Sequence, residues 1–126
     1  MSQPEQDRRI DYIEFATRDI AATKKFYAAS FAWAFKDYGP DYTSFSDRRL
    51  SGGFARNASA PTKMNPLVVI YAMDLEKTQA RIIAAGGKIT AKTHDFPGGR
   101  RFSFADPAGL ELAVWSDLRD DGTAIK

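Results

Sequence analysis

The sequence contains no cysteine among its 126 residues, and its one histidine is His94. Without thiols the chain has no disulfide, no thiolate metal site and no cysteine nucleophile. It also lacks any apolar run near the roughly 20 residues that cross a bilayer. The opening stretch MSQPEQDRR has no apolar core of the kind found in signal peptides. We therefore expect a cytoplasmic protein without a membrane partner.

Charge of either sign is scattered rather than clustered. The 18 Lys and Arg residues nearly balance the 16 Asp and Glu residues, which leaves a formal net charge of +2. This balance gives no argument for a nucleic-acid partner. Hydrophobic residues make up 44% and charged residues 27%, as in a soluble globular protein. The length suits one compact domain.

A repeat organises this domain. Residues 10–16 alternate like a strand, and Asp19 then opens a stretch with apolar residues at helical spacing. The apolar run 67–72 and Asp74 repeat this pattern later, and Gly86 with Gly87 marks the end of the second helix. The sequence therefore predicts two similar units, each beginning with a strand followed by a helix.

Three short strands follow each predicted helix. They are residues 34–38, 42–46 and 53–56 in the first half and 88–93, 100–104 and 110–115 in the second. We predict an α+β fold of two tandem βαβββ modules, about residues 10–56 and 65–115, joined by the linker NASAPTKMNP. Both belong to one domain of residues 10–118, between a flexible N-terminal tail (1–9) and a C-terminal tail (119–126). One such module leaves apolar surface bare, so the two must share a core.

Three stretches carry a resemblance that covers nearly the whole chain after Arg9. They are YIEFATRDIAATKKFY, VVIYAMDLEKTQARIIAAGGKI and DPAGLELAVW. Together they resemble the vicinal oxygen chelate superfamily of glyoxalases, bleomycin-resistance proteins and extradiol dioxygenases. The resemblance implies a curved mixed sheet that closes a cup, helices outside it, and commonly a homodimer. It implies no single reaction, because the superfamily includes lyases, dioxygenases and drug-binding proteins.

The resemblance also implies where metal ligands would lie. Counted from the Asp residues that open the helices and the last turn, these positions hold Tyr12, Leu67 and Ala113, and Phe54 by a count that a gap would shift. A divalent metal needs histidine, carboxylate or similarly strong donors converging from several strands. We therefore expect no metal cofactor at the usual family site.

Strand alternation predicts an aromatic lining for the cup instead. If Ala105 pairs with Leu110 across the closing turn, Phe102 and Phe104 lie beside Ala113 and Glu111. The predicted ligand-binding face then consists of Tyr12, Glu14, Leu67, Val69, Tyr71, Phe102, Phe104, Glu111, Ala113 and Trp115. Such a face suits a small aromatic or apolar compound.

Four polar residues each allow two interpretations. Glu14 and Glu111 are candidate catalytic acid and base, or carboxylates that are solvated or paired with arginine. His94 is a ligand contact at the cup rim or an ordinary polar position. Arg100 holds a substrate carboxylate or phosphate, or it is a solvated hairpin end.

Two functional classes remain open on the sequence alone. The first is a metal-free protein that binds a small aromatic or apolar compound, with or without a non-metal enzymatic activity. The second is a metal-dependent lyase or dioxygenase whose ligands are displaced to Glu14, His94 and Glu111. Whether the cup forms within one chain or across a homodimer also stays open.

Overall fold

The computed structural model describes residues 3–61, 65–107 and 110–126. The chain divides into two compact units. The first module is Tyr12–Leu67, and the second module is Val68–Lys126 together with the N-terminal segment up to Asp11. Among the described residues, no helix is both long and apolar enough to span a membrane.

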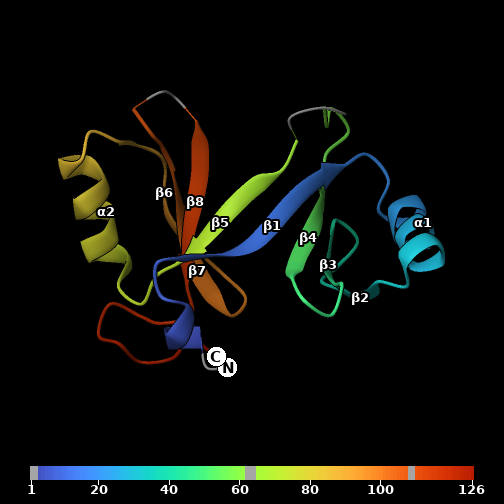
Figure 1. Cartoon of the computed structure of the whole chain (residues 1–126), viewed down its shortest axis with the longest axis horizontal. Coiled ribbons are helices and arrows are strands. Elements are labelled where there is room, and N and C mark those ends of the chain that lie inside the picture. The colour runs from blue at the N-terminus through green and yellow to red at the C-terminus, as the bar shows by residue number, and fades with distance from the viewer. Residues whose placement is uncertain (1–2, 62–64, 108–109) are drawn as a thin grey trace. The chain divides into compact units, whose positions relative to one another are not determined.

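The first module follows the predicted element order (Figure 1). It contains β1 (Arg9–Thr17) from Tyr12 onward, α1 (Ile20–Phe31), β2 (Ala34–Asp37), β3 (Tyr42–Ser46) and β4 (Ser51–Arg56). The strands lie in the order β2-β3-β4-β1. The β1–β4 pair is parallel, whereas β2–β3 and β3–β4 are antiparallel.

The second module repeats this topology. It contains β5 (Leu67–Tyr71), α2 (Leu75–Ala84), β6 (Lys88–Phe96), β7 (Gly99–Ala105) and β8 (Glu111–Ser116). The strands lie in the order β5-β8-β7-β6, with β5–β8 parallel and the other two pairs antiparallel. The α+β fold class and the tandem βαβββ repeat are therefore confirmed.

Both helices begin at the predicted aspartates. The Asp19 carboxylate accepts a hydrogen bond from the Ala22 amide at 3.0 Å, and Asp74 accepts one from Lys77 at 2.9 Å. Each bond satisfies a donor that the first helical turn would otherwise leave unpaired. Helix α2 ends at Ala84, and Gly86 follows it with φ 98°, a left-handed conformation that favours glycine.

Stacked aromatic rings hold the helix-side face of the first module. The Phe54 ring lies 5.3 Å from Phe15 and 5.5 Å from Tyr27 of α1, measured between ring centroids. Trp33 stacks on Tyr27 at 4.7 Å and on Phe45 at 4.5 Å. The half-buried Trp33 thus packs within the first module.

Aliphatic packing dominates the second module. Its core cluster consists of the buried residues Ala72, Leu75, Phe102 and Val114, with Ile70, Ile82, Ile89 and Phe104 packed against them. Leu75 and Ile82 come from α2, so this cluster is where the helix covers the sheet. Phe102 and Phe104 therefore belong to the helix-covered core.

The expected register of the last hairpin is wrong by one residue. Ala105 pairs with Glu111 rather than with Leu110, and Phe102 pairs with Val114. A shift of one residue moves every side chain of a strand to the opposite face. Phe102 and Phe104 consequently do not share the face of Ala113 and Glu111. Ala108 and Gly109 of the predicted turn lie outside the described residues.

The segments expected as tails carry structure of their own. Gln3–Gln6 form a 3-10 helix, and the Arg8 amide donates to the Tyr71 carbonyl at 2.8 Å. At the other end, the Ile125 amide donates to the Asp117 carbonyl at 2.7 Å. Both segments are therefore tied to the second module by backbone hydrogen bonds.

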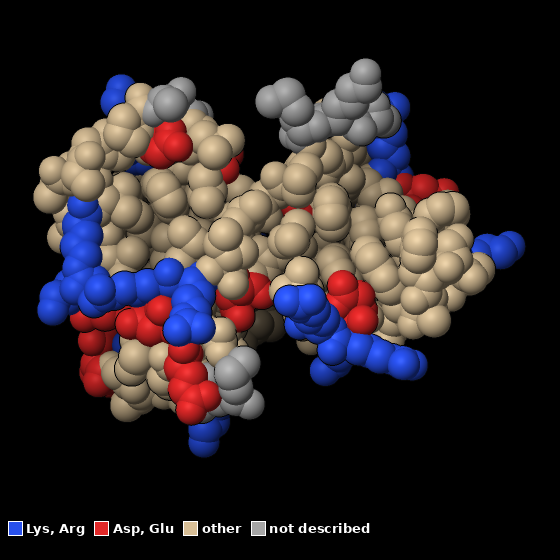
Figure 2. Space-filling view, viewed as in Figure 1, with Lys and Arg blue, Asp and Glu red and all other residues tan. Residues whose placement is uncertain are grey.

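Charges of both signs lie interspersed on the face shown in Figure 2. Within the first module Lys24 pairs with Asp37 at 2.8 Å and Arg56 with Asp41 at 3.0 Å. Exposed ion pairs of this kind contribute little stability, but each places a positive and a negative charge side by side.

Candidate ligand-binding site

Two tyrosines meet on the sheet face of the first module that lies opposite the helix. The Tyr12 hydroxyl of β1 and the Tyr42 hydroxyl of β3 are 2.7 Å apart and share a hydrogen bond. Both side chains are half-buried, as is Glu14, two residues along β1 from Tyr12. Alternation along β1 places Tyr12 and Glu14 on this face, because Phe15 stacks on the helix side. The predicted placement of Tyr12 and Glu14 on one face is thus confirmed.

Gly53 of β4 makes room for this pair of hydroxyls. It is buried and pairs with Glu14 on β1 and with Ser44 on β3. A β-carbon at Gly53 would overlap the hydroxyls of both tyrosines. The missing side chain therefore permits the Tyr12–Tyr42 contact directly above the strand.

Burial and charge keep the Tyr42 phenol protonated. Burial raises the pKa of Tyr42 far above its ordinary value, and the negative charge of Glu14 and the hydrogen bond with Tyr12 raise it further. Tyr42 is a neutral hydroxyl at neutral pH, as a tyrosine with its ordinary pKa of 10.0 also is, and it lies in hydrogen-bond contact with Tyr12 and Glu14. Tyr42 was not predicted as a site residue. Strand alternation offered one signal for this role, because it places Tyr42 on the same face of β3 as Ser44, which pairs with Gly53.

A second group of predicted residues shares one face of the second module. Val69 pairs with Ala113 and Tyr71 with Trp115, so these four lie together as predicted. Val69 is 2% exposed, and Tyr71 and Ala113 are 0% exposed. These positions are therefore packed rather than open. Leu67, at the start of β5, is half-buried.

The polar atoms of this group already have partners. The Tyr71 hydroxyl donates to Asp117 at 2.6 Å, and the Trp115 indole N–H donates to Asp11 at 2.9 Å. Burial, followed by the bond to Asp117, raises the pKa of Tyr71 above its ordinary range. Because the Tyr71 hydroxyl and the Trp115 indole N–H are both bonded within the module, the groups on this face that remain are mainly apolar.

Arg100 does not extend over a ligand site as a free cation. Its guanidinium makes two hydrogen bonds to Glu76 of α2, at 2.6 and 2.9 Å, and its Nε donates to the Leu118 carbonyl at 2.8 Å. Its side chain is only 10% exposed. Arg100 is thus not a solvated hairpin end; it connects α2 and the C-terminal segment to β7.

This ion pair predicts an acid-sensitive contribution to stability. The bonds from Arg100 hold the pKa of the Glu76 carboxyl below its ordinary value of 4.5. A carboxylate with a lowered folded-state pKa stabilises the fold above the unfolded pKa and loses this contribution as the pH falls through the folded pKa. Glu76→Gln should therefore lower the free energy of unfolding at pH 7 and have less effect at pH 3. Urea unfolding at both pH values measures this difference, with Glu5→Gln as the control. An equal loss for Glu76→Gln at pH 7 and pH 3 would contradict it.

Glu111 and His94 lie in the second module as exposed side chains. The Glu111 carboxylate accepts a hydrogen bond from Thr90 at 2.7 Å. His94 lies inside β6, opposite Arg101, and its Nδ1 is 3.3 Å from the Lys92 carbonyl. The Glu111 carboxylate therefore has a hydrogen-bond partner, Thr90, within its own module.

The donor set at the family's metal positions does not fit a metal site. Val69 pairs with Ala113 and, in the first module, the equivalent residue Glu14 pairs with Gly53. Gly53, not Phe54, is therefore the counterpart of Ala113. The four positions then hold Tyr12, Gly53, Leu67 and Ala113. Across the described residues, no group of three His, Cys, Asp or Glu side chains is placed to hold a metal ion.

Residues 9–114 match the Glyoxalase/Bleomycin resistance protein/Dioxygenase superfamily, and the chain belongs to this superfamily. The protein CFP32 of Mycobacterium tuberculosis is 24% identical over 125 residues, which cover 91% of this chain and 48% of CFP32. The anthracycline biosynthesis protein DnrV of Streptomyces peucetius is 31% identical over 124 residues, with 82% and 45% covered. The chain thus spans about half the length of these curated relatives.

Solved structures of the superfamily share the fold. The Mn(II)-bound glyoxalase from Novosphingobium aromaticivorans is 24% identical with a TM-score of 0.65, covering 89% of this chain and 40% of that one. A superfamily member from Vibrio splendidus 12B01 is 14% identical with a TM-score of 0.67, covering 86% and 98%. At these identities the likeness concerns the fold alone, so function rests on the site residues.

Proposed function

We propose that this chain binds a small aromatic or apolar compound without a metal, at the first-module face formed by Tyr12, Glu14 and Tyr42. The Tyr12–Tyr42 contact above Gly53 is the observation that carries the proposal. It places the Tyr12 phenol, at a position where the superfamily resemblance implies a metal ligand, in hydrogen-bond contact with the Tyr42 phenol. The polar end of the ligand bonds to this cluster, and its flat body packs on the tyrosine rings.

The chemistry of the cluster suits recognition by hydrogen bonds. The two phenols and the Glu14 carboxylate are hydrogen-bonded to one another, so a polar group on the ligand would exchange with one of these bonds. In the partly buried setting of Tyr42, such bonds are stronger than in water. The cluster thereby selects a compound with one polar group on an otherwise apolar frame.

A non-metal enzymatic activity is the second candidate, and Glu14 carries it. A carboxylate beside a protonated tyrosine supplies the two partners of a proton transfer: Glu14 accepts the proton and Tyr42 donates a hydrogen bond to the developing negative charge. The metal-dependent alternative, with Glu14, His94 and Glu111 as ligands, has no matching cluster among the described side chains.

A thermal-shift screen of chelator-treated protein tests the binding function. Aromatic acids, antibiotics and 2-oxo compounds are suitable probes, because a ligand that binds only the folded state raises the melting temperature. Tyr42→Phe should weaken a hit about fivefold to tenfold, the usual effect of losing one hydrogen bond. Tyr38→Phe is the matched control, since Tyr38 is 51% exposed on the neighbouring strand connection. Equal affinities of the two variants would contradict the assignment.

We propose in addition that the protein is a homodimer. Several large apolar side chains are exposed, among them Ile10 at 65%, Phe31 at 62% and Leu110 at 62%. Open sheet edges and apolar surface of this kind favour pairing with a second copy. Sedimentation velocity at micromolar concentration should give a species of twice the 14.0 kDa chain mass. A monomer alone would contradict the proposal.

A further inference from the structure

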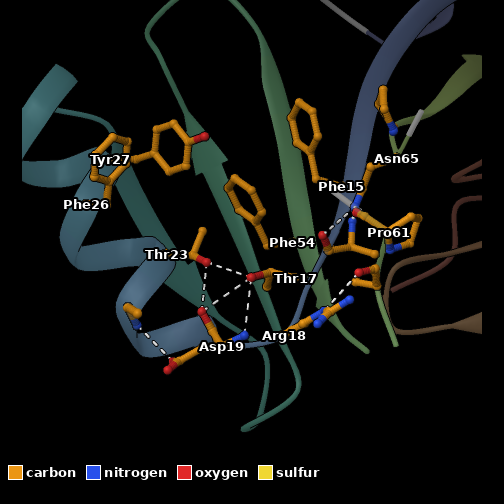
Figure 3. A pocket seen from close by; sticks show the side chains of 14 residues that line it. Phe15, Thr17, Arg18, Asp19, Thr23, Phe26, Tyr27, Phe54, Pro61 and Asn65 are labelled. Carbon is orange, nitrogen blue, oxygen red and sulfur yellow. Dashed lines mark hydrogen bonds between the residues drawn. The ribbon is translucent and has the colours of Figure 1, made fainter. Parts of the chain in front are cut away.

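A cleft opens on the helix side of the first module (Figure 3), and neither Tyr12 nor Tyr42 lines it. Its volume is about 660 Å³. The cleft is a wide depression open to solvent rather than an enclosed cavity. Its lining comes from α1, the ends of β1 and β4, and the linker that follows β4.

Aromatic rings form the apolar wall of this cleft. Phe15, Phe54 and Tyr27 lie side by side in Figure 3, with adjacent ring centroids 5.3 and 5.5 Å apart. Phe26 contacts Tyr27 edge-on at 4.9 Å and is 56% exposed. Phe54 is 5% exposed and stacks within this wall, so Phe26 is the ring on which an aromatic ligand can pack.

Most polar groups of the lining are already satisfied. The Asn65 side chain makes two hydrogen bonds to the Ala16 backbone, at 2.6 and 2.8 Å, and a third to Pro61 at 2.6 Å. The Thr17 and Thr23 hydroxyls bond to each other at 2.7 Å. A ligand in the cleft would therefore find few open hydrogen-bonding groups on these walls.

Arg18 is the exception in this lining. Its Nε donates to the Ala60 carbonyl at 3.0 Å, and its two terminal nitrogens have no hydrogen bond or ion pair within the described part of the chain. Asp19 points away from Arg18 in Figure 3, toward the start of α1, where it caps the Ala22 amide. The guanidinium edge is thus available for an anionic partner, and a carboxylate matches its geometry.

We infer that this cleft is a second binding site, for a planar aromatic carboxylate that packs on Phe26 and the rings beside it and pairs with Arg18. The site is separate from the proposed tyrosine site, because Phe15 and Phe54 face the helix whereas Tyr12 faces the opposite side of the sheet. The two sites can therefore be tested independently.

The test is calorimetric titration of the full chain with 2-naphthoate and with its uncharged counterpart 2-naphthamide. Wild type should bind 2-naphthoate about tenfold more tightly than 2-naphthamide, a difference of about 1.4 kcal/mol. Arg18→Gln should remove this preference, whereas the control Arg49→Gln, in the loop between β3 and β4, should keep it. A preference that survives Arg18→Gln would overturn the inference.

Substitution of two phenylalanines of α1 distinguishes binding in the cleft from binding to exposed apolar surface elsewhere. Phe26 lines the cleft, whereas Phe31 is 62% exposed on the same helix outside it. Phe26→Ala should weaken 2-naphthoate at least about fivefold, and Phe31→Ala less than about twofold. Both positions are exposed, so both variants should melt near wild type. Equal weakening by the two, no binding by wild type, or sensitivity to Glu14→Gln instead of Phe26→Ala would overturn the inference.

Discussion

Gly52→Ala should destabilise the first module severely. A β-carbon at Gly52 would overlap the Ile13 backbone carbonyl and the Phe45 ring. Neither can withdraw easily: Ile13 is paired within the sheet, and Phe45 is 6% exposed and stacked on Trp33 at 4.5 Å. Forcing a methyl group into such a site costs about 3 kcal/mol.

The melting temperature measures this effect. A loss of this size corresponds to a fall of about 10 °C for a domain of this length. Tryptophan fluorescence, to which both Trp33 and Trp115 contribute, senses this packing through Trp33, whose ring lies against Phe45 and Tyr27. Ser51→Ala, at the exposed neighbouring position, is the control and should melt close to wild type. A melting temperature of Gly52→Ala within about 2 °C of wild type would show that the packing around Gly52 is looser than described.

Gly53→Ala should have a different consequence, although it adds the same methyl group one residue further on. The added atom would overlap the hydroxyl ends of Tyr42 and Tyr12. These are the tips of side chains that can move, so the module should stay folded while the two hydroxyls separate. The proposed site then loses its paired phenols, and affinity for a ligand of the tyrosine site should fall about a hundredfold, or about 2.7 kcal/mol.

The two glycine variants therefore act as controls for each other. Gly52 faces Phe45 on the helix side, and Gly53 faces the tyrosines. Loss of binding in Gly53→Ala with a melting temperature near wild type would support the tyrosine site. Retained affinity in folded Gly53→Ala would contradict it, because no arrangement with Tyr12 and Tyr42 in their present positions accommodates the methyl group.

The fold could be predicted because its signals are local. Asp19 and Asp74 cap the helices as predicted, and strand alternation correctly placed Phe15 with the helix and Tyr12 opposite it. These features depend on neighbouring residues and on side-chain periodicity, both of which are visible in a sequence.

The errors arose where distant residues determine the arrangement. The register of β7 against β8 depends on the length of one loop, and a single residue moved Phe102 and Phe104 from the predicted ligand face into the core. Arg100 was misjudged because its partner Glu76 lies on another element. Tyr42 was missed since only the β3–β4 pairing brings it above Gly53, next to Tyr12. Local patterns do not specify such pairings.

The central claim is that this member of the superfamily binds its ligand through Tyr12, Glu14 and Tyr42 without a metal. Calorimetric titration of the best compound from the thermal-shift screen into chelator-treated protein, before and after addition of Mn(II), tests it most directly. We predict the same dissociation constant in both titrations, within about twofold. Binding that is absent after chelation and restored by Mn(II) would contradict the claim.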